Sequence, residues 1–345
     1  MTEGWGGWWT EAKLEILRKY LHAFNLASAR AGATVYLDLF AGMPTHTRPD
    51  NDAAHDGSTA IALAAEPRFT RLVFWELEAT ASRLQSALEE SWSADDRWHV
   101  VSGDSNATTN TGLSIVTDLQ WAPTFAFIDP KGLDVAWTTL ERLAGWRKGK
   151  TKVELWILLP EPAMERVLGL QGVRGRNTAE QLTTLFGSED WVAIHERRKS
   201  GDYTAEQTRA EYVNLLRWRL QNRLDYKITH PLTLTNATGA PVYTMIFATD
   251  HEVGGTIMRD IYRHAYVNEI PQLRRLALAH REQTKRDATG VQSLFQPPPP
   301  PVAATEYQHT EPWEPPTRST ETPILDELDE LDDLDDYGPF DPEDF

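Results

Sequence analysis

Five short apolar runs, each of strand length, alternate with helical patterns in the first half of the chain. They cover residues 35–39, 71–75, 98–101, 124–128 and 152–159. This alternation predicts an α/β fold with a parallel, doubly wound sheet. Ligands of such sheets gather at the carboxyl ends of the strands. The ends of these runs are therefore the first places to look for a functional site.

The first run has the sequence TVYLDLFAGMP, from Thr34 to Pro44, and carries an aspartate inside it. It ends in Ala41-Gly42, where the backbone can turn sharply. Asp38 and Gly42 then fall where a nucleotide-like cofactor is held, next to the following loop and helix start. The competing interpretation is a core strand followed by an ordinary turn.

Four acids, Asp38, Glu76, Asp104 and Asp129, lie in or just after the ends of four successive runs. In a parallel sheet these acids converge on one edge. An acid after the second strand, in the position of Glu76, can accept hydrogen bonds from both ribose hydroxyls. The alternative is chance together with helix capping. For the helix that follows Asp104, we expect Ser105 or Asn106 as the cap.

Further segments complete a predicted globular region over residues 1–290. Helices are expected at 10–30, with Thr10 as N-cap, and at 58–65, separated by a polar loop at 43–57. His46 and His55 in this loop are a weaker candidate for a metal site than for a solvated loop, and no metal is expected. A helical insertion follows at about 161–223. The remaining expected elements are helices near 162–168, 178–186 and 204–223, strands at 226–235 and 241–248, and helices at 255–270 and 272–286.

The two late strands, separated by a turn-rich segment, predict a hairpin that closes the sheet. Together with the five runs they give a mostly parallel seven-stranded sheet with an antiparallel last strand. Pro231 lies inside the first of the two strands, which indicates an edge or a bulge because proline has no N–H for the ladder. Added helices surround this sheet.

Composition excludes several classes of site. The chain has no cysteine, so disulfides, thiolate zinc sites and a cysteine nucleophile are excluded. No apolar run approaches the roughly 18 residues that a membrane span needs, and the N-terminus does not resemble a signal peptide. We therefore expect a cytoplasmic protein with no membrane contact.

The net charge of −17 is concentrated at the C-terminus. Residues 291–345 hold 15 of the 51 acids and one of the 34 bases, which leaves 36 acids and 33 bases, a net of −3, for residues 1–290. Residues 291–323 are expected to form a Pro-rich linker. Residues 324–345 form an acidic, Leu-containing tail that is expected to be disordered alone. It could recruit a protein partner, keep the chain soluble, or displace nucleic acid from basic patches of the body.

The order of these motifs resembles one protein family. A strand with DLFAG, a strand ending in an acid, GDSN, a strand with IDPKG, VELWILLP and a late YTMIFATDH are similar to the three-Cys-motif partner family (TcmP). The resemblance runs from about residue 11 to 266. It implies a Rossmann-like methyltransferase fold of the kind that binds S-adenosylmethionine (SAM). It also implies a partner protein with a three-cysteine motif, of radical-SAM-like type.

The resemblance also implies roles for individual residues. Asp38, Phe40 and Gly42 would lie at the methionine part of SAM and the backbone turn, and Glu76 would lie at the ribose. The remaining implied positions are Asp104 at the adenine and Asp129-Pro130 at the catalytic mouth.

Two departures from familiar patterns bear on this assignment. The family reads DLFAGPG, whereas Pro44 here replaces the second glycine and removes a free N–H. This change weakens the inference of SAM binding. The loop Asp129-Pro130-Lys131-Gly132 also lacks the second proline and the aromatic residue with which many enzymes methylate flipped bases. Base methylation is therefore not favoured over other acceptors.

Two functional hypotheses follow. The first is a SAM-dependent methyltransferase in which Asp129 orients or deprotonates the acceptor. The second is a catalytically inactive, methyltransferase-like scaffold that recruits another component, in defence against mobile DNA.

Overall fold

A seven-stranded sheet forms the centre of the protein. The computed structural model describes residues 7–47, 54–162, 164, 173–236, 239–289, 307 and 310–317. The strands of the central sheet are β1 (Val35–Asp38), β4 (Arg71–Glu76), β5 (Trp98–Ser102), β6 (Thr124–Ile128), β7 (Glu154–Leu159), β8 (Ile228–Thr235) and β9 (Pro241–Thr249).

The strand order is β5-β4-β1-β6-β7-β9-β8, and β9 is antiparallel to both of its neighbours. The pairs among β5, β4, β1, β6 and β7 are all parallel. The predicted fold, a mostly parallel seven-stranded sheet of the Rossmann-like methyltransferase type with an antiparallel last strand, is therefore confirmed. β8 is the outer strand, so Pro231 lies on an edge as expected, where its missing N–H interrupts no ladder.

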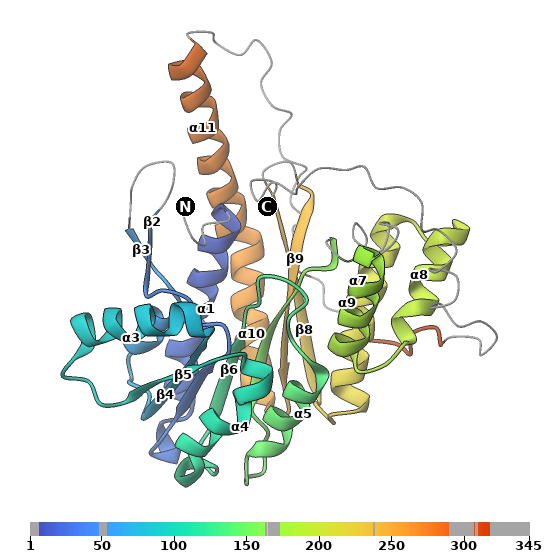
Figure 1. Cartoon of the computed structure of the whole chain (residues 1–345). Helices are drawn as coiled ribbons and strands as arrows, with labels where there is room; N and C mark the ends of the chain where they lie inside the picture. The colour runs from blue at the N-terminus through green and yellow to red at the C-terminus, as the bar shows by residue number, and fades with distance from the viewer. Residues whose placement is uncertain are drawn as a thin grey trace.

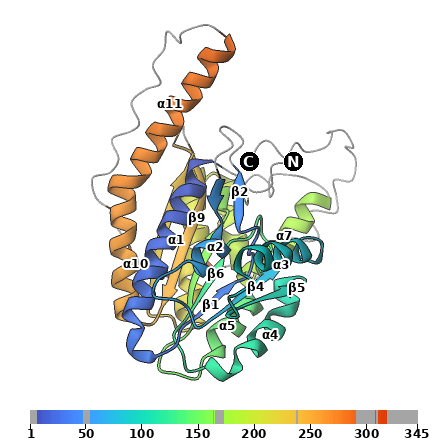
Figure 2. The ribbon, with the colours of Figure 1, turned by 90° about the vertical axis from the view of Figure 1, so that its left-hand side faces the viewer.

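Helices cover both faces of the sheet (Figures 1 and 2). The helices up to β7 are α1 (Trp8–Ala27), η1 (Ala29–Ala31), α2 (Ser58–Leu63), α3 (Glu78–Trp92), α4 (Ser105–Ile115), η2 (Thr117–Leu119) and α5 (Trp137–Trp146).

The later helices flank β8 and β9 along the chain. They are α7 (Val173–Phe186), α8 (Asp190–Ser200), α9 (Ala205–Asn222), α10 (Glu252–His264), the π-helical segment η3 (Ala265–Glu269) and α11 (Ile270–Thr289). α10, η3 and α11 follow one another without a break. α11 projects beyond the sheet (Figure 1).

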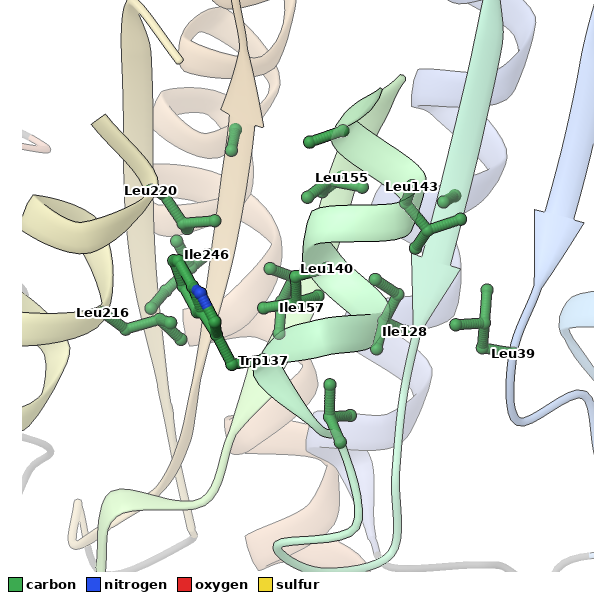
Figure 3. Packing of buried hydrophobic residues seen from close by; sticks show 14 of the residues in the cluster. Leu39, Ile128, Trp137, Leu140, Leu143, Leu155, Ile157, Leu216, Leu220 and Ile246 are labelled. Atoms are coloured by element: carbon green, nitrogen blue, oxygen red, sulfur yellow. The ribbon is translucent and has the colours of Figure 1, made fainter. Parts of the chain in front are cut away.

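The two-residue period of the strands divides the apolar side chains between two cores. Figure 3 shows one of them, where Trp137 and Leu140 of α5 and Leu216 of α9 pack against Ile157 and Ile246 of the sheet. The other core lies under α1 and α10, which run side by side (Figure 2). The sheet is therefore buried on both faces, as a mostly parallel sheet must be.

Two details of the helices differ from the sequence predictions. α1 begins at Trp8 with Gly7 as its N-cap, so the prediction of Thr10 as cap was wrong. α8 was not predicted, because its apolar residues are confined to its first half. The helix expected near 162–168 falls mostly outside the described residues.

Among the residues that the structure describes, no helix is long and apolar enough to cross a membrane. The predicted acidic tail at 324–345 lies outside the described residues, as does most of the linker at 291–323. The part of the linker that is described, Tyr307 and residues 310–317, lies against α9 and β8.

Candidate functional site

The carboxyl ends of β1, β4, β5 and β6 bring the four predicted acids to one edge of the sheet. Asp38 is in register with Phe74 and Phe127. Glu76 and Asp129 each lie two residues beyond these partners. Successive strand residues point to opposite faces, so Asp38 and Glu76 belong to the face that also carries Phe74 and is covered by α1.

Asp38 is fully buried at this edge. Its carboxylate accepts hydrogen bonds from the Tyr36 hydroxyl at 3.1 Å and from the Phe40 backbone N–H at 3.3 Å. Burial, with a smaller contribution from the nearby charge of Asp129, raises the pKa of the Asp38 carboxyl to about 7. Asp38 therefore supports the turn from within the protein and presents no surface to a ligand.

Phe40, predicted beside the cofactor, has two roles within the protein. Its N–H bonds Asp38, and its half-buried side chain packs against the core under α5. It fixes the conformation of the turn that leads to Gly42.

Glu76 and Gly42 are joined directly. Gly42 has a left-handed φ of 63°, a conformation that glycine adopts without steric cost. Its N–H donates to Glu76 Oε2 at 2.9 Å, while Glu76 Oε1 accepts from the Leu77 N–H at 2.9 Å and the Thr80 hydroxyl at 2.5 Å. A carboxylate offers about four lone-pair positions, so one remains on Oε2 for a further donor.

A large apolar side chain lies next to this acid. Leu77 is 61% exposed at the start of α3. Isolated exposed leucines are common on protein surfaces. Its position directly after Glu76 nevertheless places an apolar surface beside a carboxylate at the sheet edge.

The segment after Gly42 forms a hairpin and not the polar loop that we predicted at 43–57. Strands β2 (Thr45–Thr47) and β3 (Ala54–Asp56) pair antiparallel, and residues 48–53 between them lie outside the described residues. The Pro44 carbonyl accepts the Gly57 N–H at 2.7 Å. A Cβ on Gly57 would lie 2.4 Å from the Met43 carbonyl oxygen, so glycine is needed at the base of this hairpin.

Asp104 acts as a helix cap. Its Oδ1 accepts the Asn106 backbone N–H at 2.9 Å, which makes Asp104 the N-cap of α4. The prediction of Ser105 or Asn106 as cap was therefore wrong. The Asn106 side chain instead donates to the Asp134 carbonyl at 2.6 Å and accepts from the Ala136 N–H at 2.9 Å. Asp104 is exposed, and Asn106 joins the start of α4 to the loop after β6.

Asp129 forms an ion pair with Lys13, a residue that we did not predict. The Lys13 ammonium lies 2.5 Å from Asp129 Oδ2 and 5.2 Å from the centre of the Tyr243 ring. The side chain of Lys13 is 8% exposed and that of Asp129 is 21% exposed. Pro130 behind Asp129 is buried. This pair brings α1 against the end of β6.

Glu161 is a further acid at this edge that the sequence interpretation missed. It follows β7, is buried, and accepts the Thr244 backbone N–H at 2.9 Å and the Thr244 hydroxyl at 2.7 Å. Burial raises its pKa to about 7. Its position after a strand end, as for Asp129, was the available signal.

The histidines of the hairpin do not assemble a metal centre with the described acids. His46 and His55 are register partners in β2 and β3. In the part of the chain that the structure describes, no three His, Asp or Glu side chains are grouped to hold a metal ion. The acids of the same segment are Asp56, which ends β3, and Asp50 and Asp52, which lie outside that part.

Taken together, the edge contains two neighbouring arrangements. Asp38 and Asp129 lie under α1, which carries Lys13, and the charge of Asp129 acts on Asp38. Glu76, Gly42 and Leu77 form the second, at the ends of β1 and β4. The charge of Asp104 acts on Asp134 in the loop after β6, whose pKa is raised first by burial and then by that charge.

Comparison with known proteins adds no family assignment: no protein-family model and no curated protein matches the chain.

Proposed function

We propose that this chain is a methyltransferase-like protein that binds SAM at the carboxyl edge of its sheet and acts together with a partner protein, as the resemblance to the three-Cys-motif partner family implies. The observation that carries this proposal is the arrangement of Glu76 after the second strand of the sheet, joined to the glycine turn after the first strand. In nucleotide-binding sheets a carboxylate in this place accepts hydrogen bonds from the ribose.

Glu76 and Leu77 are suited to the nucleoside part of SAM. Glu76 is held by three donors from Gly42, Leu77 and Thr80, and Oε2 retains a position for one ribose hydroxyl. Leu77 offers an apolar surface on which a base can pack. Asp104, exposed at the next strand end, would contact the exocyclic amine of adenine.

The Lys13–Asp129 pair is suited to the methyl acceptor. SAM supplies an electrophilic methyl group on its sulfonium. Asp129 is partly exposed, and Lys13 holds one of its oxygens, so the other oxygen can accept a hydrogen bond from an acceptor hydroxyl or amine. Lys13 fixes the direction of that carboxylate and Pro130 fixes the backbone behind it.

Calorimetric titration with SAM tests the binding proposal. We expect saturable heat with the wild-type chain and at least tenfold weaker binding to Glu76→Gln, because an amide provides only one acceptor oxygen. Glu78→Gln, which changes an exposed acid two residues away, should bind like the wild type. An absence of heat at millimolar SAM would exclude the proposal, and equal affinity of all three chains would remove Glu76 from the site.

A second function, that of a catalytically inactive scaffold, is favoured by a different observation. The N–H of Gly42 is bonded by Glu76, Asp38 is fully buried, and Pro44 has no N–H, so three groups near the turn are withdrawn from a ligand. A scaffold would recruit its partner without SAM, in defence against mobile DNA. Co-purification with a candidate three-Cys-motif protein, with and without residues 323–345, tests this role. A partner lost only with the tail supports it, and recovery unchanged by the deletion argues against the tail as the contact.

A further inference from the structure

A segment near the C-terminus lies across the outer edge of the sheet. Tyr307 and residues 310–317, which we call the strap, contact α9, β8 and α10 (Figure 1). The strap belongs to the Pro-rich region that sequence composition assigns to a linker. Composition indicates an extended conformation for such a region but gives no information about what it contacts.

Tyr307 is the first contact of the strap. Its hydroxyl donates to the Pro231 carbonyl at 2.5 Å, and its ring centre lies 5.9 Å from that of Tyr262 and 6.2 Å from that of Tyr266. Burial raises the pKa of Tyr307 well above its usual value. An aromatic residue that packs against two other rings and donates its hydroxyl to a backbone carbonyl is suited to anchor a segment.

Arg217 of α9 joins the strap to the edge strand. It is only 3% exposed. Its Nε donates to the Thr229 hydroxyl at 3.1 Å, and Nη2 donates to the carbonyls of Thr229 at 3.3 Å and Thr310 at 2.5 Å. Burying a charged group is costly unless it is fully hydrogen-bonded. The strap therefore supplies an acceptor that the buried guanidinium needs.

Asn214, three residues before Arg217 on α9, makes the next contact. Its side-chain N–H donates to the Trp313 carbonyl at 3.1 Å, three residues after Thr310. The strap thus runs antiparallel to α9. Pro315 is buried beyond it, whereas the Trp313 side chain is half exposed. Two side chains of α9 therefore bind backbone carbonyls of the strap, whose tyrosine is half-buried and one of whose prolines is buried.

The edge strand has a matching pattern. The carbonyls of Thr229 and Pro231 accept from Arg217 and Tyr307. These two residues are two positions apart, so both carbonyls point away from β9, on the open side of β8. An open edge needs such capping to avoid pairing with other chains. The side chains of α9 that donate to the strap therefore lie beside the strand edge that the strap covers.

We propose that the surface formed by α9, the outer edge of β8 and α10 is a binding site for an extended, proline-containing peptide with a tyrosine anchor, and that the strap occupies it as an exchangeable ligand from the same chain. Prolines at 312, 315 and 316 hold the segment extended and remove N–H groups that would need acceptors. The donors Arg217 and Asn214 fit such a segment because an extended proline-containing segment forms no internal hydrogen bonds, so its backbone carbonyls accept from donors on another element. This site is separate from the proposed SAM site and does not depend on it.

A labelled peptide tests the proposal on the full-length chain. The probe is a synthetic peptide spanning residues 305–318 with an N-terminal fluorescein, followed by fluorescence anisotropy. In the wild-type chain the strap covers the proposed site, so we expect the labelled peptide to bind weakly. In the Tyr307→Ala chain the strap has lost its anchor, so the peptide should bind at least tenfold more tightly. Trp313→Ala, which alters a half-exposed side chain whose carbonyl makes the contact, should behave like wild type.

Three further measurements keep the result decisive. The same peptide with alanine in place of its tyrosine should not bind the Tyr307→Ala chain. Adding Asn214→Ala to that chain should weaken peptide binding severalfold. If Tyr307→Ala does not fold by circular dichroism, Tyr307→Phe, which removes only the hydroxyl, should show an increase of at least threefold over wild type. Equal peptide affinity for wild-type and anchor-deficient chains, or equal affinity of the peptide without tyrosine, would overturn the proposal.

Discussion

The backbone N–H of Gly42 donates a 2.9 Å hydrogen bond to Glu76, so the turn after the first strand is held by the acid at the end of its neighbour. The two residues are 34 positions apart in sequence. The acid that the proposed function assigns to a ribose is thus also a structural support of the glycine turn. A change at Glu76 should affect stability as well as ligand binding.

Glu76→Ala should lower the free energy of unfolding by about 1–3 kcal/mol, because the Gly42 N–H and the Thr80 hydroxyl lose their acceptor. Urea denaturation followed by circular dichroism measures the loss. Glu90→Ala, an exposed acid on α3, is the control and should stay within about 0.5 kcal/mol of wild type. A Glu76 variant as stable as this control would show that the hydrogen bond contributes little.

The Lys13–Asp129 pair should show energetic coupling in a double-mutant cycle. Lys13→Met, Asp129→Asn and the double variant should give a coupling of about 2 kcal/mol, between the values typical of exposed and buried pairs. Arg68 and Glu66 form an exposed pair at 3.1 Å and serve as the comparison. Their coupling should stay below about 0.5 kcal/mol. Similar coupling energies for the two ion pairs would contradict the expectation that burial strengthens the Lys13–Asp129 pair.

Two helix glycines should respond in opposite directions to alanine. A Cβ on Gly112 of α4 would lie 1.9 Å from the Trp75 ring, whereas a Cβ on Gly145 of α5 meets no atom within 4 Å. Gly112→Ala should therefore destabilise by roughly 1–3 kcal/mol through overpacking. Gly145→Ala should be neutral or stabilise by up to about 1 kcal/mol, since alanine favours helix. Thermal unfolding of both variants checks the signs, and a tolerated Gly112→Ala would place Trp75 differently.

Buried carboxyls should make the protein less stable as the pH rises towards neutrality. Burial raises the pKa of Asp38, Glu154 and Glu161 to about 7. Between the unfolded pKa near 4 and the folded pKa near 7, the folded chain binds protons that the unfolded chain has lost. The stabilisation is complete below this window and is lost as the pH rises through it.

Glu154→Gln tests this pH dependence at one residue. Glu154 accepts hydroxyls from Tyr20 at 2.5 Å and Thr249 at 2.8 Å. Between pH 4.5 and 7.5 the wild type should lose about 3 kcal/mol more stability than Glu154→Gln. Urea denaturation at several pH values measures the slope, with Glu90→Gln as the control that should follow wild type. Parallel curves for wild type and Glu154→Gln would show that this carboxyl keeps an ordinary pKa.

The sequence predicted the central sheet well because its strands are buried on both faces and therefore form continuous apolar runs. The positions of Asp38 and Glu76 at one edge followed from strand ends alone. The β2–β3 hairpin was missed because its strands are polar and half exposed, so no apolar alternation marks them.

Contacts between residues far apart in the sequence could not be predicted, for a different reason. Lys13 and Asp129 are 116 positions apart, and a lysine on a helix is normally exposed. One signal was present: Lys13 lies four residues before Leu17, which the helical period places on the buried face of α1. Asp104 was interpreted as a ligand contact, yet Asp, Ser and Asn are all good N-caps, so sequence alone could not choose among 104, 105 and 106.

The strap also determines how much free chain separates the folded body from the acidic tail. The acidic tail begins at residue 324, seven positions after the last described residue of the strap, 317, which is a reach of at most about 25 Å. Counted from the end of α11, the same tail would begin 35 residues away. A protein partner bound by the tail, as we propose, would therefore be confined to a small volume beside α9, where its local concentration would reach the millimolar range. Release of the strap from its contacts would lengthen this connecting chain severalfold. The local concentration of the partner would then fall, although no acidic residue had changed.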